Sequence, residues 1–89
     1  MKNLTLYYIP TCPFCEKVLR HLEELGKEIP LKNIRSHPEL KQELIDIGGK
    51  KQVPCLVIDG EPLYESDAIV LWIEEHPHCI PDLPPNKRM

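Results

Sequence analysis

The chain begins with a two-residue alternation of apolar positions and then changes to a helical period. The alternation covers residues 4–9, in a segment rich in aromatic and branched side chains, and predicts a strand. Pro10 interrupts it, and Pro13 suits the first turn of a helix, where its missing N–H costs nothing. We therefore expect a helix that ends at a left-handed Gly26. Its core-facing residues are predicted to be Phe14, Val18, Leu22 and Leu25.

The next segment predicts a weaker strand and a second helix. Residues 29–34 favour a short strand, and Pro30 places it near a sheet edge because proline cannot donate to a ladder. Ser36 and Glu39 match the S-x-x-E capping box, so a helix capped by Ser36 is expected over about residues 38–47. Its predicted core face consists of Leu40, Leu44 and Ile47.

A hairpin and a last helix are predicted in the second half. Asp59-Gly60 supplies the positive φ angles of a two-residue turn between strands at 54–58 and 61–64. Ser66 is expected to cap a helix that ends before Pro77. A helical crossover joins the first two strands, which are therefore expected to be parallel. The order βαβαββα predicts an α/β fold, with a four-stranded mixed sheet flanked by three helices.

Composition limits the organisation and the partners. A chain of 89 residues, 42% of them hydrophobic, suits one domain, which we expect over residues 1–76, followed by a Pro-rich tail over 77–89. The net charge of -3 is mixed along the chain, which argues against nucleic acid as a partner. No apolar run approaches the roughly 20 residues of a membrane span, and no signal peptide is evident. We expect a cytoplasmic monomer with no membrane partner.

The cysteines form one close pair and two isolated residues. Cys55 and Cys79 stand alone, which is unlike the disulfide framework of a small secreted protein. Disulfide exchange requires a thiolate, and Cys12 directly precedes a predicted helix, whose N–H groups and dipole favour the charged form. We predict Cys12 as the nucleophile and Cys15, one turn further on, as the resolving thiol.

The same cysteine spacing also occurs in zinc sites, which usually need a second pair. Cys55 and Cys79 lie far apart, and His76 and His78 would complete a ligand set only if the tail folded back. A pair that follows a strand and opens a helix favours redox chemistry, so no metal is expected. An iron–sulfur or zinc carrier that uses Cys12 stays the alternative.

Three short motifs follow one another along the chain: YIPTCPFC at 8–15, KQVP at 51–54 and ESDAI at 65–69. Together they resemble the glutaredoxin family, and more narrowly the thioredoxin-fold half shared by glutathione-transferase-like glutaredoxins and glutathione transferase N-terminal domains. The resemblance implies a thioredoxin-like fold. It also implies an oxidoreductase that reduces protein disulfides or glutathione mixed disulfides, with glutathione or a similar thiol as co-substrate.

The same resemblance implies which residues bind glutathione. It places Pro54 in a cis peptide opposite the cysteines, and the backbone of Val53 against the cysteinyl unit of glutathione. Glu65, Ser66 and Asp67 are implied to bind the γ-glutamyl end. A helix N-terminus offers N–H donors for a carboxylate, and acidic side chains suit an ammonium group.

One position departs from the pattern that the resemblance implies. Ile9 stands where glutaredoxins usually carry a lysine that holds a glutathione carboxylate. Lys50, Lys51 or Gln52 are candidates for this role because they precede Val53, and the other interpretation is a solvated basic loop. The residues from 73 onward resemble the linker of glutathione transferases, so a transferase-like domain is a further alternative.

Overall fold

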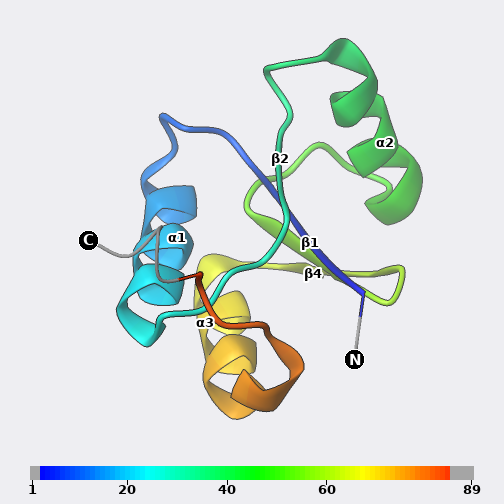
Figure 1. Cartoon of the computed structure of the whole chain (residues 1–89). Helices are drawn as coiled ribbons and strands as arrows, with labels where there is room; N and C mark the ends of the chain where they lie inside the picture. The colour runs from blue at the N-terminus through cyan, green and yellow to red at the C-terminus, as the bar shows by residue number, and fades with distance from the viewer. Residues whose placement is uncertain (1–2, 85–89) are drawn as a thin grey trace.

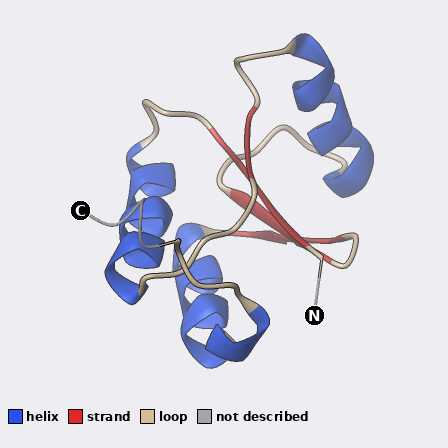
Figure 2. Cartoon of the chain, in the orientation of Figure 1, coloured by secondary structure: helices blue, strands red, loops and turns tan. Residues whose placement is uncertain are grey.

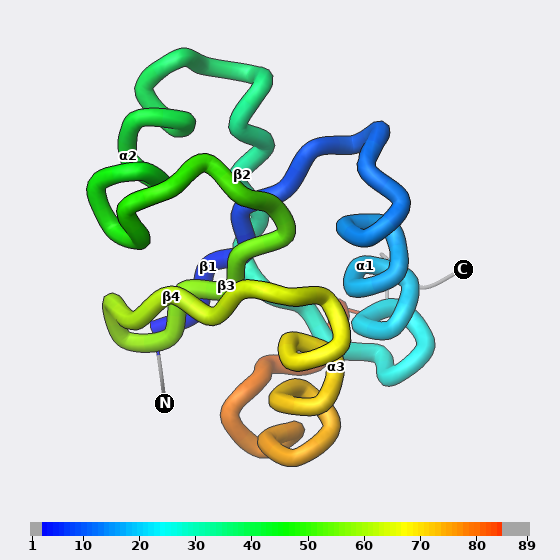
Figure 3. The backbone as a smooth tube through the Cα atoms, turned by 180° about the vertical axis from the view of Figure 1, so that it is seen from behind, coloured from blue at the N-terminus to red at the C-terminus, as the bar shows by residue number. Residues whose placement is uncertain are grey.

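A four-stranded mixed sheet between two layers of helices forms the protein, as a computed structural model of residues 3–84 shows (Figures 1 and 2). Helices α1 (Pro13–Leu25) and α3 (Ser66–Glu75) cover one face, and α2 (Pro38–Gly48) covers the other. The same division is seen from behind (Figure 3). The strands are β1 (Leu4–Tyr8), β2 (Leu31–Asn33), β3 (Cys55–Ile58) and β4 (Glu61–Tyr64). The predicted α/β class and βαβαββα order are confirmed.

The strands lie in the order β2-β1-β3-β4. The β1 and β2 strands are parallel, and both other pairs are antiparallel, as expected for a crossover followed by a hairpin. Asp59 and Gly60 have φ angles of 49° and 87°, so the predicted turn with two positive φ angles is confirmed. The edge strand β2 is shorter than the predicted 29–34, because Pro30 offers no N–H and enters the ladder only as an acceptor from Leu6.

The sheet divides the buried side chains into two clusters. Alternate residues of β1 point to opposite faces, so Leu6 belongs to the cluster under α1 and α3, and Tyr7 to the cluster under α2. The first cluster contains Leu4, Leu6, Val18, Leu22, Ile29, Leu56, Ile69, Ile73 and Ile80. The second contains Tyr7, Ile34, Leu44, Cys55 and Val57. The central strands are therefore covered on both faces.

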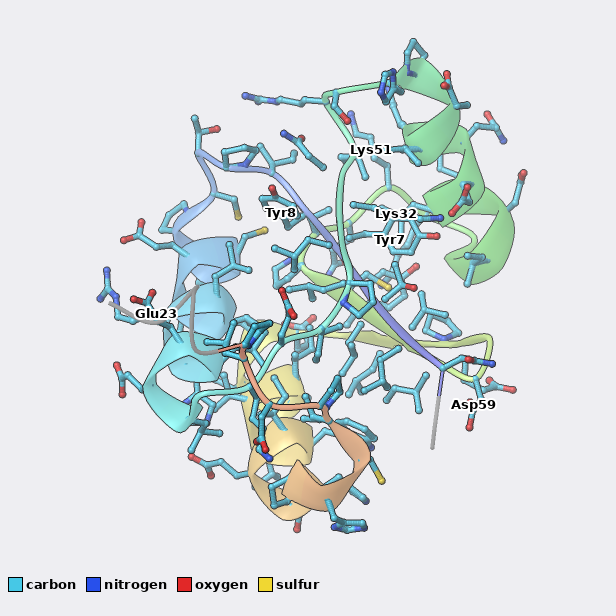
Figure 4. The ribbon with its side chains drawn as sticks, viewed as in Figure 1. Tyr7, Tyr8, Glu23, Lys32, Lys51 and Asp59 are labelled. Atoms are coloured by element: carbon cyan, nitrogen blue, oxygen red, sulfur yellow. The ribbon has the colours of Figure 1, made fainter. Side chains whose placement is uncertain are left out.

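A polar contact ties α2 to the sheet beside the second cluster. The buried Tyr7 hydroxyl donates to the Glu43 carboxylate, which also pairs with the Lys32 ammonium. Tyr7 and Lys32 lie side by side at the edge that α2 covers (Figure 4). The two hydrogen bonds, that of Lys32 first, hold the pKa of Glu43 below its ordinary value. Glu43 therefore stays ionised at neutral pH and fastens the helix to β1 and β2.

The buried stripe of α1 differs from the predicted one. Cys15, Val18 and Leu22 are buried, whereas Phe14 is 62% exposed and Leu25 is 42% exposed. At about 100° per residue, Phe14 and Leu25 fall at one margin of the stripe, and its centre lies between Val18 and Cys15. The prediction was wrong for these two residues because the spacing i, i+4 fits more than one phase of the helix.

Both predicted serine caps are also wrong. The cap of α2 is His37, and the Ser36 hydroxyl instead donates to the Asn33 carbonyl at 2.6 Å within the preceding turn. The cap of α3 is Glu65, and Ser66 is the first residue of the helix. Serine hydroxyls bond the backbone in turns as readily as at helix ends, so local sequence does not separate the two uses.

The segment after α3 packs back onto the domain. A single 3-10 turn, Pro77–Cys79, follows α3, and Ile80 is buried in the first cluster. The backbone N–H of Glu28 donates to Pro81, and that of Leu83 donates to Gly26. Residues 85–89 of the expected tail lie outside the described part of the chain. Among residues 3–84, no helix is long and apolar enough to cross a membrane.

Candidate active site

Cys12 lies in the connection between the central strand β1 and helix α1. Its N–H donates to the Ile9 carbonyl at 3.1 Å, and its own carbonyl accepts from Glu16 at 3.0 Å, so it closes a turn and caps the helix. Pro13 occupies the first helical position. The sulfur of this half-exposed residue therefore sits at the end of α1 where N–H groups are unpaired.

Hydrogen bonds favour the thiolate of Cys12. Burial by itself would raise its pKa, but donation from the Cys15 backbone, the Cys15 thiol and the Phe14 backbone outweighs it, and the pKa lies below its ordinary value. These donors come from the first turn of α1, as the position of the motif predicts. The site therefore holds more thiolate near neutral pH than an ordinary cysteine does.

Cys15 has the opposite environment. Its side chain is fully buried in the stripe of α1 that faces the sheet. Burial raises the pKa of its thiol to about 11, the Ile9 backbone lowers it in part, and the nearby Cys12 raises it further. The pair is therefore asymmetric, with one accessible thiolate and one buried thiol that donates to it.

Removing the thiol of Cys15 is expected to raise the pKa of Cys12, because the thiolate loses a donor. Cys15→Ala removes the donor, whereas Cys15→Ser keeps a hydroxyl in its place, so the alanine variant should hold less Cys12 thiolate at pH 7 than the serine variant. The measurement is the pH dependence of Cys12 alkylation by iodoacetamide, followed by mass spectrometry. Equal pKa values in the two variants would contradict this account of the site.

A hollow of about 350 Å³ lies beside the cysteine motif. It collects all five residues that the resemblance assigned to glutathione, from the connection before β3 and from the start of α3. Its lining consists of Phe14, Gln52, Val53, Pro54, Glu65, Ser66 and Asp67. Cys12 is not part of this lining, and Phe14, two residues further on, is the motif residue that reaches it. Phe14 was missed as a site residue because its apolar side chain fitted the predicted core face of the helix, whereas the structure leaves it exposed.

The connection from α2 to β3 supplies one wall of the hollow. The Val53–Pro54 peptide is cis, as the resemblance implied. Pro54 is buried, and Val53 is half-buried and packs on the second cluster. This arrangement places the backbone of Val53 at the rim of the hollow.

The N-terminus of α3 supplies the opposite wall. Ser66 is 9% exposed, while the acidic residues on either side of it are exposed. Glu65 accepts a hydrogen bond from Gln52 at 3.3 Å, and Asp67 forms an ion pair with Lys17 of α1. The wall thus combines helix N–H groups with two carboxylates, a mixture that suits a ligand bearing both a carboxylate and an ammonium group.

Glu65 has an unfavourable backbone conformation for a residue with a side chain. Its φ of 73° and ψ of 118° lie outside the regions that L residues favour. The free energy of unfolding of Glu65→Gly should therefore be about 1 kcal/mol higher than that of Glu65→Ala, since only glycine relieves the strain. Urea denaturation of the two variants measures the difference. Both variants lose the carboxylate, so an alanine variant at least as stable as the glycine variant would contradict the prediction.

The candidate replacements for a lysine at position 9 differ in their surroundings. Ile9 packs against the second cluster. The Lys50 ammonium lies over the Tyr64 ring, 4.4 Å from its centre, and Gln52 is bonded to Glu65. Lys51 is exposed in the connection between α2 and β3, and Figure 4 shows it on the side of the sheet where the β2–α2 connection runs.

The two isolated cysteines lie apart from this surface. Cys55 is fully buried in the second cluster, under α2, where burial raises the pKa of its thiol. Cys79 is half-exposed in the turn after α3. In the described part of the chain, no three His, Cys, Asp or Glu side chains are grouped so that they could hold a metal ion.

The mixed sheet, the Cys-x-x-Cys pair at the start of α1 and the cis-proline before β3 define a thioredoxin-fold protein. The family model for glutaredoxin matches residues 4–63, and the chain belongs to the glutaredoxin family. A glutathione S-transferase of Arabidopsis thaliana, DHAR2, is 38% identical over 68 residues, which cover 72% of this chain and 30% of the relative. The chain spans about a third of the length of the curated relatives that it matches.

Solved structures give the same result for the fold. A delta-class glutathione transferase from Nilaparvata lugens is 31% identical, with a TM-score of 0.67 over 82% of this chain and 35% of its own. Oxidized glutaredoxin 2 from Chlamydomonas reinhardtii is 20% identical, with a TM-score of 0.63 over 83% of this chain and 73% of its own. The second comparison concerns the fold alone, and it extends over most of both chains.

Proposed function

We propose that the protein is a glutathione-dependent thiol–disulfide oxidoreductase that reduces glutathione mixed disulfides and disulfides of proteins. The observation that carries the proposal is the asymmetry of the pair. Cys12 is accessible and its pKa is lowered, whereas Cys15 is buried and protonated. Only one of the two thiols is suited to attack an external disulfide.

The proposed reaction begins when the Cys12 thiolate attacks one sulfur of the substrate disulfide. A bond forms between Cys12 and that sulfur, the substrate S–S bond breaks, and the second substrate sulfur leaves as a thiolate that takes a proton. Glutathione then attacks the sulfur bonded to Cys12, forms a new disulfide with it and releases Cys12 as the thiolate. Alternatively, Cys15 attacks the Cys12 sulfur and releases the substrate as a thiol, and the resulting Cys12–Cys15 disulfide is reduced by two molecules of glutathione. Two electrons pass from the attacking thiols to the substrate disulfide.

The hollow beside Phe14 is the proposed glutathione site. The backbone of Val53, beside Pro54, would pair with the cysteinyl unit, which brings the ligand sulfur to Cys12. Ser66 and the helix N–H groups suit the γ-glutamyl carboxylate, and Glu65 and Asp67 suit its ammonium group.

Glutathione is the proposed resolving thiol for glutathione mixed disulfides. Cys15 is fully buried, and a pKa of about 11 leaves little thiolate at neutral pH. Cys15→Ser should therefore keep turnover of a glutathione mixed disulfide within about threefold of wild type, and should lose turnover of a protein disulfide that needs a dithiol. The measurement is reduction of both substrates at fixed glutathione. If the variant lost both activities, Cys15 would be the resolving thiol; if the wild-type protein reduced neither substrate, the proposed function would fail.

A transferase activity is the second candidate, because curated relatives named glutathione S-transferases are 31–38% identical to the chain. Conjugation needs an electrophile pocket beside the glutathione thiol, and the hollow lies against the exposed Phe14 ring. An assay with glutathione and 1-chloro-2,4-dinitrobenzene distinguishes the two. Conjugation that persists in Cys12→Ser, without disulfide reduction in the wild type, would favour the transferase.

A further inference from the structure

The connection between β2 and α2 is fastened to the end of β1 immediately before the nucleophile. Parallel strands bring their carboxyl ends to the same edge of a sheet, and here Asn33 pairs with Tyr8 at the last position of both strands. The N–H of Ile34 donates to the Tyr8 carbonyl at 3.1 Å, and the N–H of Arg35 donates to the Asn33 side chain at 2.9 Å. Arg35 is therefore held at the edge from which the Cys12 turn departs.

The side chain of Arg35 reaches toward that turn. Its Nη1 donates to the Thr11 hydroxyl at 3.1 Å, and Thr11 is the residue directly before Cys12. A guanidinium has five N–H donors, and this bond uses one of them. Within residues 3–84, no carboxylate is paired with Arg35, and the residue is exposed. The Arg35 guanidinium, which has no carboxylate partner among these residues, is thus bound to the residue next to the nucleophile.

Other nearby cations are already engaged. Lys17 is paired with Asp67, on the far wall of the hollow, and Lys50 lies over the Tyr64 ring. The hollow itself is lined by carboxylates and neutral groups, so it offers a substrate carboxylate no cationic side chain. Lys51 is the competitor, although no contact ties it to the Cys12 turn, whereas the bond to Thr11 places Arg35 there. The planar guanidinium also matches a carboxylate in two parallel hydrogen bonds, which an ammonium group does not.

We propose that Arg35 is the carboxylate-binding residue of this site, and that it holds a carboxylate of the substrate whose sulfur bonds to Cys12. The inference rests on the proposed disulfide exchange and adds the residue that selects its substrates. Two sources offer the same chemistry: the glycyl carboxylate of glutathione, and an acidic side chain beside the cysteine of a protein substrate. In both cases the carboxylate lies on the Thr11 side of Cys12, where the guanidinium is bound.

Two pairs of mixed disulfides with 2-mercaptoethanol test the inference in a single turnover with the reduced protein. The first pair is the glutathione disulfide and its glycyl ethyl ester. The second is a capped Cys-Glu dipeptide disulfide and its Cys-Gln counterpart. Release of 2-mercaptoethanol as a function of disulfide concentration separates half-saturation from the maximal rate, for wild type, Arg35→Gln, Arg35→Lys and, as the variant of the competing cation, Lys51→Gln.

Arg35→Gln is expected to raise the half-saturating concentration about fivefold for the charged member of at least one pair, with an unchanged maximal rate and no effect on the neutral member. Arg35→Lys should recover part of the loss, and Lys51→Gln should behave as wild type. The pair that responds identifies the source of the carboxylate. An equal effect on charged and neutral members, or a loss in Lys51→Gln in place of Arg35→Gln, overturns the inference alone. Absence of any reaction in the wild type overturns the proposed function as well.

Discussion

Replacement of Cys12 by serine is expected to lower the rate of disulfide reduction by at least about a thousandfold. The hydroxyl of serine does not ionise near neutral pH, so the hydrogen bonds that favour the Cys12 thiolate have no anion to stabilise. Cys15 offers no replacement, because it is fully buried and its pKa is about 11. The loss should therefore appear in the maximal rate with every disulfide substrate.

The matched control for this variant is Cys79→Ser. Cys79 is half-exposed in the turn after α3, outside the hollow and outside the Cys12 turn, so its replacement should leave turnover unchanged. Reduction of a glutathione mixed disulfide, with glutathione as the reductant, measures both variants. Residual activity of Cys12→Ser above one per cent or so, or an equal loss in Cys79→Ser, would mean that another group attacks the disulfide.

Replacement of Ile69 by alanine is expected to lower the free energy of unfolding by about 2–5 kcal/mol. Ile69 is fully buried in the first cluster, where it fixes α3 against the sheet, and the truncated side chain leaves a cavity. Native domains are stable by about 5–15 kcal/mol, so the loss is a large fraction of the total. It should appear as a lower midpoint of urea denaturation at an unchanged slope.

The control for this prediction lies on the same helix. Leu71 is 54% exposed, and Leu71→Ala should change the free energy of unfolding by no more than about 0.5 kcal/mol. Both changes introduce alanine into α3, so the difference between the two losses in free energy of unfolding reports burial and not helix propensity. Equal losses in the two variants would show that α3 does not pack through Ile69 as described.

The periodicity of the sequence predicted most of the fold, because helices cover both faces of the sheet and each helix must turn a stripe of apolar residues toward it. Leu40, Leu44 and Ile47 line the predicted face of α2, and Ile69 and Ile73 that of α3. The phase of α1 was harder to predict, since several apolar residues of that helix fit overlapping stripes. The difference has a functional reason: Phe14 is apolar, yet it lies at the hollow and not in the core.

The candidate site was only partly predictable. The motifs predicted Cys12, Cys15 and five residues of the hollow, because these lie in short segments with a recognisable pattern. Arg35 has no such pattern, and its neighbour Thr11 is distant in sequence, so only the pairing of β1 and β2 brings the two together. Contacts of this kind depend on tertiary structure, which local propensity does not encode.

The unequal anchoring of the helices has a consequence for motion. Helix α2 fully buries one side chain, Leu44, and is also held by the half-buried Leu40 and Ile47 and by the Glu43 contacts, whereas α1 and α3 each bury three residues. Local unfolding begins where the least apolar surface is buried, so α2 is the element that opens at the lowest free energy. Cys12 and the Ser66 wall are built on the two firmly anchored helices. The thiolate therefore keeps its donors when α2 detaches, whereas Arg35 and Val53 lie in the connections on either side of α2 and are subject to that motion.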